Sequence, residues 1–132
     1  MQVAKDSIDL GIIVRDLDAC RKFYGEELGL PFEAELALPD GARMYRYKIG
    51  TTILKLVKPP KEAPKGPVGM RVQSGIRYFT ISVRDIDGAV RGLEAKGHKF
   101  EVSLREIRPG VRIAILPDPD GNLVELIEIR PV

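Results

Sequence analysis

The pattern of hydrophobic and polar positions in residues 8–58 predicts one strand, one helix and then three more strands. Residues 8–14 are mostly apolar and β-branched, which is typical of a strand, and Asp16 follows them in the position of a helix N-cap. Leu17, Cys20, Tyr24 and Leu28 then recur at helical spacing, and Gly29 follows as a residue that commonly ends helices. Three further strands are expected at 32–38, 44–49 and 52–58.

The same order of elements recurs in the second half of the chain. Residues 14–24, VRDLDACRKFY, correspond to residues 83–93, VRDIDGAVRGL, at an offset of 69. This half predicts a strand at 77–83, a helix between Asp85 and Gly97, and strands at 99–104, 111–116 and 123–129. Such a repeat is too long for a solenoid unit and too short for a full domain. We therefore expect one α+β domain made of two βαβββ modules, at 6–58 and 74–130, joined by a proline-rich linker at 59–73.

Alternation along the strands separates an apolar face, expected to lie under the helices, from a face that carries polar residues. The second face holds Asp9, Gly11, Ile13, Ile53, Lys55, Val57, Tyr78, Thr80, Ser82, Leu123, Glu125 and Ile127. On it, Lys55 and Glu125 are each flanked by aliphatic residues two positions away on both sides. An ionisable group in such surroundings costs folding free energy unless it is paired or functional. Both residues are therefore candidate site residues.

Composition narrows the chemistry available to this domain. The 132 residues include 21 Lys and Arg against 19 Asp and Glu, a near balance that argues against a dedicated nucleic-acid binder. One Cys excludes an intramolecular disulfide, and one His excludes a paired-histidine metal site within one chain. No apolar run approaches the roughly 20 residues of a membrane span. We expect a soluble, cytoplasmic domain that binds neither nucleic acid nor membrane.

Two motifs carry a resemblance to a known family. The repeated segment at 14–18 and 83–87, together with DPDGNLVEL at 118–126, resembles the vicinal oxygen chelate superfamily, which includes glyoxalase I, extradiol dioxygenases and bleomycin resistance proteins. The resemblance covers nearly the whole chain. It implies a glyoxalase-like fold, with eight mostly antiparallel strands in a curved sheet around a concave cleft, a small-molecule substrate or ligand, and a homodimer. It does not fix the reaction, since the members differ in chemistry.

The resemblance also implies four ligand positions in the metal-dependent members, one in the first and one in the last strand of each module. These positions hold Asp9, Lys55, Tyr78 and Glu125 in this chain, and Glu125 alone has the residue type usual for its position. A lysine ammonium donates hydrogen bonds, cannot coordinate a metal, and repels a divalent ion. We therefore expect no cofactor and no metal. A bound divalent ion would have to use Asp9, Tyr78 and Glu125.

We hypothesise that Asp9, Lys55, Tyr78 and Glu125 are catalytic residues of a lyase- or isomerase-type enzyme. Its substrate would be a small molecule that carries a carbonyl or carboxylate group. Lys55, held between Asp9 and Glu125, would stabilise negative charge on a substrate oxygen, and a carboxylate would transfer a proton, with Tyr78 as donor or anchor. The expected substrate-binding residues are Ile13, Ile53, Val57, Thr80, Ser82 and Ile127.

Other interpretations fit the same residues. The alternative to an enzyme is a non-catalytic drug- or metabolite-binding resistance protein, with a polar floor and aliphatic walls. A metal-dependent lyase or dioxygenase with an atypical ligand set is a further alternative. A purely structural interpretation makes Lys55 one half of a buried salt bridge with Asp9 or Glu125. The sequence leaves open the substrate and whether the site is built within one chain or across a swapped dimer.

Overall fold

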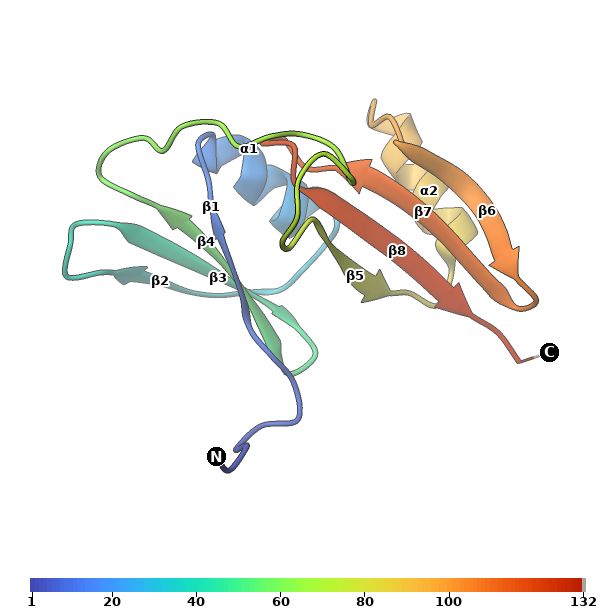
Figure 1. The fold of residues 1–132 in the computed structure, drawn as a ribbon, viewed down its shortest axis with the longest axis horizontal. Coiled ribbons are helices and arrows are strands. Elements are labelled where there is room, and N and C mark those ends of the chain that lie inside the picture. The colour runs from blue at the N-terminus through green and yellow to red at the C-terminus, as the bar shows by residue number, and fades with distance from the viewer. Residues whose placement is uncertain (132) are drawn as a thin grey trace. The chain divides into compact units, whose positions relative to one another are not determined.

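Two compact units make up the chain in the computed structural model, which describes residues 1–131 (Figure 1). The first is Met1–Lys65 and the second is Gly66–Val132. Each unit contains one four-stranded sheet and the helical segment that follows its first strand. The eight predicted strands are thus hydrogen-bonded as two sheets of four, and the predicted α+β organisation in tandem modules is confirmed.

The first unit has the predicted order of elements. They are β1 (Leu10–Ile13), α1 (Leu17–Arg21), the π-helix η1 (Lys22–Glu27), β2 (Phe32–Ala37), β3 (Arg43–Ile49) and β4 (Thr52–Lys58). The strand order in the sheet is β1-β4-β3-β2. β1 pairs with β4 in parallel, whereas the β2–β3 and β3–β4 pairings are antiparallel, so the sheet is mostly antiparallel as expected.

The helical segment of this unit begins as predicted and changes type partway. The Asp16 side chain accepts a hydrogen bond of 3.1 Å from the backbone N–H of Ala19, which makes Asp16 the N-cap. The segment continues into η1, whose wider turn was not predicted. Gly25 in η1 lies directly against the ring of Tyr47, because an added Cβ would come within 2.9 Å of Tyr47 Cε1. Glycine therefore permits this close packing of the π-helix on β3.

The second unit repeats the arrangement. Its elements are β5 (Tyr78–Ser82), α2 (Ile86–Ala95), β6 (Val102–Arg108), β7 (Val111–Pro117) and β8 (Leu123–Ile129), and the strand order is β5-β8-β7-β6. β5 and β8 are again the parallel pair. Asp85 caps α2 by accepting a hydrogen bond of 3.0 Å from the N–H of Gly88. Gly29 and Gly97 both have positive φ just after the helices, as expected for residues that end them.

The predicted strand at 99–104 is wrong in position, because β6 spans Val102–Arg108. The reason lies in the turn that joins β6 to β7. Arg108 pairs with Val111 across a two-residue connection in which Gly110 has a φ of 78°. The Glu106 carboxylate accepts a hydrogen bond of 3.0 Å from the N–H of Gly110. This tight turn carries the strand four residues beyond its predicted end.

Each unit buries one face of its sheet against its own helical segment. The buried residues of the first unit include Val14, Cys20, Phe23, Tyr24, Leu54 and Leu56, and those of the second include Ile86, Val90, Leu93, Val124 and Leu126. Alternate residues of β1, β4, β5 and β8 therefore lie on the opposite sheet faces, which carry the predicted site residues. Within residues 1–131, no helix is long and apolar enough to cross a membrane.

Candidate functional site

In the first unit, the sheet face opposite α1 places Lys55 beside Gly11 and Arg46. Gly11 is the register partner of Lys55 on β1, and Arg46 is its partner on β3. Ile53 and Val57 flank Lys55 along β4, and Ile13 is the register partner of Val57. Four first-unit members of the predicted site, Ile13, Ile53, Lys55 and Val57, thus share one face, whereas Asp9 lies just before β1.

Lys55 is a partly buried ammonium with space beside it. Within residues 1–65 it makes no hydrogen bond and no ion pair. Its neighbour Arg46 is engaged instead, through a 2.8 Å bond from Nε to Glu33 Oε1. A Cβ added to Gly11 would meet nothing within 4 Å, so the space opposite Lys55 is open. Lys55 is therefore the cation on this face that has room for an incoming group.

Asp9 is held by groups other than Lys55. Its Oδ1 accepts hydrogen bonds from Lys5 Nζ at 2.5 Å and from the N–H of Ile53 at 2.8 Å. Lys5 also donates to the carbonyl of Thr51 at 2.8 Å. The Lys5 hydrogen bond, followed by that from Ile53, lowers the pKa of Asp9 below its usual value, and the charge of Lys55 contributes less. Asp9 is thus a fixed anion, and a structural salt bridge between Asp9 and Lys55 is not formed.

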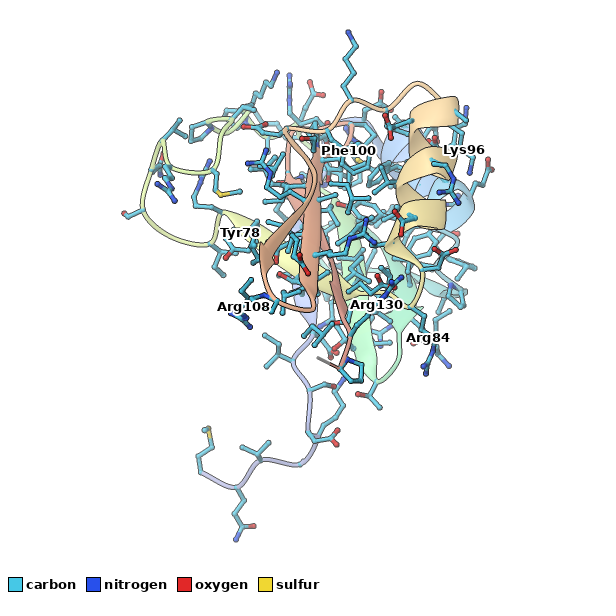
Figure 2. The ribbon with its side chains drawn as sticks, turned by 90° about the vertical axis from the view of Figure 1, so that its right-hand side faces the viewer. Tyr78, Arg84, Lys96, Phe100, Arg108 and Arg130 are labelled. Carbon is cyan, nitrogen blue, oxygen red and sulfur yellow. The ribbon has the colours of Figure 1, made fainter. Side chains whose placement is uncertain are left out.

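In the second unit, the face opposite α2 brings Thr80 to Glu125. The two residues are register partners on β5 and β8, and Thr80 Oγ1 donates a hydrogen bond of 2.8 Å to Glu125 Oε1. Tyr78 is the partner of Leu123 on the same face and is half exposed. Figure 2 shows Tyr78 on the side of the sheet away from α2. Ser82 is the partner of Ile127, so the second-unit members of the predicted site also share one face.

Apolar side chains surround Glu125 on the remaining sides. Ile115 is its register partner on β7, and Leu123 and Ile127 flank it along β8. Ile113, Ile115 and Leu123 form a buried cluster, against which Met70, Val102 and Ile127 pack. Thr80 is therefore the polar neighbour that fixes the carboxylate within an otherwise apolar surface. We call this surface, made of Thr80, Ile113, Ile115, Leu123, Glu125 and Ile127, the Glu125 face.

The donor set does not fit a divalent metal ion. Among residues 1–131 there is no group of three or more His, Cys, Asp or Glu side chains placed to share one. The first unit offers the Asp9 carboxylate, already bound by Lys5, and the Lys55 ammonium, which repels a cation. The second unit offers Glu125 with a threonine hydroxyl and a phenol nearby. No imidazole or thiolate joins either set, so the chemistry proposed below uses no metal.

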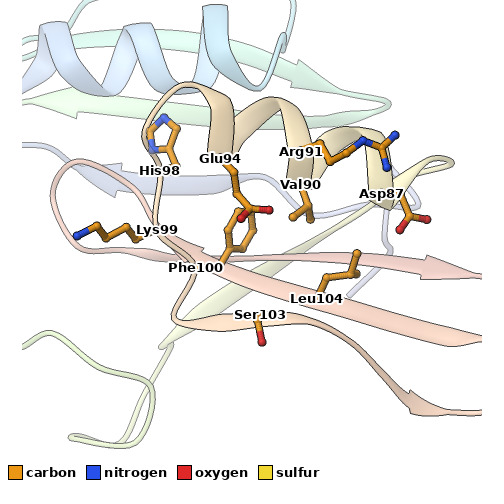
Figure 3. Close-up of a pocket in the computed structure, with 9 residues that line it drawn as sticks. All are labelled: Asp87, Val90, Arg91, Glu94, His98, Lys99, Phe100, Ser103 and Leu104. Atoms are coloured by element: carbon orange, nitrogen blue, oxygen red, sulfur yellow. The ribbon is translucent and has the colours of Figure 1, made fainter.

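A groove lies on the other side of the second sheet, between α2 and β6 (Figure 3). Its lining residues are Asp87, Val90, Arg91, Glu94, His98, Lys99, Phe100, Ser103 and Leu104. It contains the single histidine of the chain but none of the predicted site residues. Acidic and basic side chains alternate along it. The Glu125 face is therefore the stronger candidate site of this unit.

The chain belongs to the glyoxalase/bleomycin resistance protein/dioxygenase superfamily. A sequence model of this superfamily matches residues 7–126. The match includes both repeated motifs and every residue of the predicted site except Ile127. The expectation drawn from those motifs is confirmed at the level of family and fold.

Individual relatives agree with this assignment. The uncharacterized protein YaeR of Escherichia coli (strain K12) is 29% identical over 123 residues, covering 90% of this chain and 92% of that protein. The crystal structure of SMU.1112c superposes with a TM-score of 0.82 at 25% identity, covering 96% of this chain and all of the other. Lactoylglutathione lyase from Agrobacterium tumefaciens superposes with a TM-score of 0.69 at 26% identity, covering 96% and 95% of the two chains.

Two residues near the site were missed by the sequence analysis. Lys5, which holds Asp9, lies in the segment before β1, and its spacing of four residues from Asp9 was the available signal. Met70, which packs beside the Glu125 face, lies in the segment expected to be a linker. Nothing in its local sequence indicates which surface it covers, because that contact joins residues more than 40 positions apart.

Proposed function

We propose that the chain is a glyoxalase-like enzyme that moves a proton next to a carbonyl or carboxylate group of a small molecule, without a metal ion. The observation that carries this proposal is the state of Lys55. Lys55 is a partly buried residue between Ile53 and Val57 on β4, its ammonium lacks a partner within residues 1–65, and the space beside it at Gly11 is open. An unpaired cation in apolar surroundings is unfavourable for folding. A substrate oxygen that gains negative charge during reaction offsets that cost and is stabilised in turn.

Glu125 is the proton carrier in this proposal. One carboxylate oxygen accepts from Thr80, and the other makes no hydrogen bond within residues 66–131. Glu125 takes a proton from the carbon next to the carbonyl, which leaves an enolate, and the Tyr78 phenol of the same unit donates a hydrogen bond to the enolate oxygen. Return of the proton to the same carbon gives exchange or epimerisation, and return to the neighbouring atom gives isomerisation. Elimination follows when a leaving group departs from the enolate.

The other polar residues have supporting roles. Tyr78 presents a half-exposed phenol that donates a hydrogen bond to the substrate. Asp9 stays ionised because Lys5 and the Ile53 amide hold it, so it supplies negative charge rather than a proton acceptor. The likeness to lactoylglutathione lyase from Agrobacterium tumefaciens supports a lyase- or isomerase-type reaction on a carbonyl compound.

The test is exchange of substrate hydrogens in heavy water. Pyruvate, 2-oxobutyrate, lactate and S-lactoylglutathione are incubated with the protein in D₂O, and ¹H NMR follows loss of the signals next to each carbonyl. We expect exchange with at least one compound, lowered about 10²- to 10⁴-fold in Lys55→Met and in Glu125→Gln. Arg46→Met is the control, since its guanidinium is engaged by Glu33 on the same face. Full exchange in either of the first two variants contradicts the assigned roles.

Metal independence is tested in the same assay. We expect the exchange rate to be unchanged by EDTA and by added Mg²⁺ or Mn²⁺. A rate that is lost with EDTA and restored by one of these ions contradicts the metal-free mechanism. We also propose that the protein is a homodimer in solution, which sedimentation equilibrium measures directly.

A binding protein is the second candidate function, favoured by the apolar cluster beside Glu125. Ile113, Ile115 and Leu123 provide the kind of apolar lining that small-molecule sites use, with few polar groups. Saturable binding of a compound that is recovered unchanged, with no exchange of its hydrogens, supports this alternative over the enzyme.

A further inference from the structure

The segment before β5 is tied to the second unit by Arg77. We call residues 66–72 the strap; they form no helix or strand and belong to the second unit (Figure 1). Arg77 Nη2 donates hydrogen bonds to the carbonyl of Pro67 at 3.0 Å and to the carbonyl of Gly69 at 2.8 Å. One guanidinium nitrogen thus fastens two backbone positions of the strap to the start of β5.

Two apolar side chains of the strap contact the body of the unit. Val68 packs against the turn before β8, because a Cβ added to Gly121 would lie 3.1 Å from Val68 Cγ2. Met70 packs against the buried cluster of Ile113, Ile115 and Leu123. These contacts place Met70 over part of the Glu125 face, since Ile115 and Leu123 are the immediate neighbours of Glu125 there.

Met70 is partly buried against the cluster, in a segment whose neighbouring side chains are exposed. The side chains of Val68, Arg71 and Val72 are exposed, so a few weak anchors hold the strap. A segment held in this way opens at a small cost in free energy compared with the core. Methionine has three rotatable bonds and a polarizable sulfur, which allow it to repack around different partners. Withdrawal of Met70 would expose an apolar surface directly beside the Glu125 carboxylate.

We propose that Met70 is a specificity-determining residue that gives way to an alkyl or aryl group carried by the substrate. The substrate class is then a carbonyl or carboxylate compound with an apolar chain of several carbons, whose chain lies on Ile113, Ile115 and Leu123 while its polar end lies at Glu125. This assignment rests on the proposed function, because it takes the Glu125 face as the binding site.

The chain has three methionines, which makes a direct measurement practical. Protein labelled with ¹³C in the methionine methyl groups is titrated with pyruvate, 2-oxobutyrate, 2-oxohexanoate and 2-oxooctanoate, and the Met70→Leu variant assigns the Met70 signal. We expect that signal to shift on binding while the Met1 signal stays unchanged. We also expect affinity to rise by about fourfold for each added methylene that becomes buried.

Variants separate a specificity role from a packing role. Met70→Ala is expected to keep binding, but the ligand chain length at which affinity stops rising should increase. Met70→Leu is expected to keep the chain-length preference of the unchanged protein. Arg77→Met is expected to speed trypsin cleavage after Arg71 and to flatten the dependence of affinity on chain length. Arg91→Met is the matched control, because Arg91 lies on α2 and lines the groove on the other side of the sheet, to which no strap residue contributes.

The outcomes distinguish this inference from the proposed function. Affinity that does not depend on chain length, a Met70 signal that stays fixed while ligand binds, or no binding by any member of the series overturns the inference. Chain-length-dependent binding at Met70 without hydrogen exchange in any compound supports the inference and contradicts the enzymatic proposal. Hydrogen exchange with pyruvate alone, without a shift of the Met70 signal, supports the enzymatic proposal and contradicts the inference about Met70.

Discussion

The hydroxyl of Thr80 holds one oxygen of the Glu125 carboxylate at 2.8 Å, across the parallel pair formed by β5 and β8. This contact joins β5 and β8, the first and last strands of the second module. It is made by Glu125, the one predicted site residue whose type is usual for its position in the family. It fixes the carboxylate within the apolar Glu125 face, so that Glu125 presents its second oxygen in a defined direction.

Replacing Thr80 tests that relationship. Thr80→Val keeps the shape of the side chain and removes the hydroxyl, so an exposed hydrogen bond is lost. We expect the unfolding free energy to fall by about 0.5–1.5 kcal/mol. The rate of substrate hydrogen exchange should fall by a larger fraction than the unfolding free energy does. Thr80→Ser restores the donor and is expected to recover both. Equal activity of the Val and Ser variants would show that the hydroxyl does not position Glu125.

The Lys5–Asp9 pair is expected to make the stability of the protein depend on pH in the acidic range. The folded-state pKa of Asp9 lies below the usual 3.8, so the pair stabilises the protein above the unfolded-state pKa. That stabilisation is lost as the pH falls through the lower folded-state pKa. Lys5→Met is therefore expected to lower stability at pH 6, and its effect is expected to shrink as the pH falls below 3.8. Carboxyl ¹³C NMR should show the pKa of Asp9 rising toward 3.8 in this variant, and an unchanged pKa would contradict the assigned cause.

Two glycines in the helical segments predict opposite results for the same substitution. Gly25→Ala places a Cβ 2.9 Å from Tyr47, which we expect to destabilise the protein by about 1–3 kcal/mol. Gly92→Ala, in α2, meets nothing within 4 Å and is expected to stabilise it by about 0.5–1 kcal/mol through helix propensity. Urea unfolding measures both. Destabilisation by the two variants to the same extent would mean that contact with Tyr47 is not the cause.

We expect Lys55 to contribute nothing to the stability of the folded protein, or to lower it. Because its ammonium has no partner within residues 1–65, Lys55→Met should leave the protein as stable or raise its unfolding free energy by up to about 1 kcal/mol. Arg46→Met breaks the bond to Glu33 and should bring no such gain. Thermal unfolding compares the two variants. A clear loss of stability in Lys55→Met would indicate a structural role instead.

The elements that sequence analysis predicted well are those specified by local chemistry. Asp16 and Asp85 cap their helices through hydrogen bonds three residues away, and Gly29 and Gly97 supply the conformation that ends them. Strand alternation also placed Lys55 and Glu125 on the faces opposite the helices, because the strand period fixes the side of each residue.

The features that could not be predicted from the sequence depend on contacts between residues distant in sequence, or on the turn between β6 and β7. The two-residue turn at Pro109 and Gly110 extends β6, and a search for apolar residues alone does not detect it. Lys55 was expected to lie against Asp9, and the side chain that pairs with Asp9 is instead that of Lys5 from the preceding segment. Met70 reaches the Glu125 face only because the strap folds back over β7 and β8.

Lys55 and Glu125 occupy the same position of the two repeats, at an offset of 70, and carry opposite charges. In a duplicated module, each position occurs twice, once in each half. The residue at one of the two equivalent positions can be substituted while the other stays unchanged. An inherited pair of like residues can thereby become a donor and an acceptor through a single substitution. In this chain the repeat serves as a source of asymmetry, since two similar halves provide unlike chemical groups.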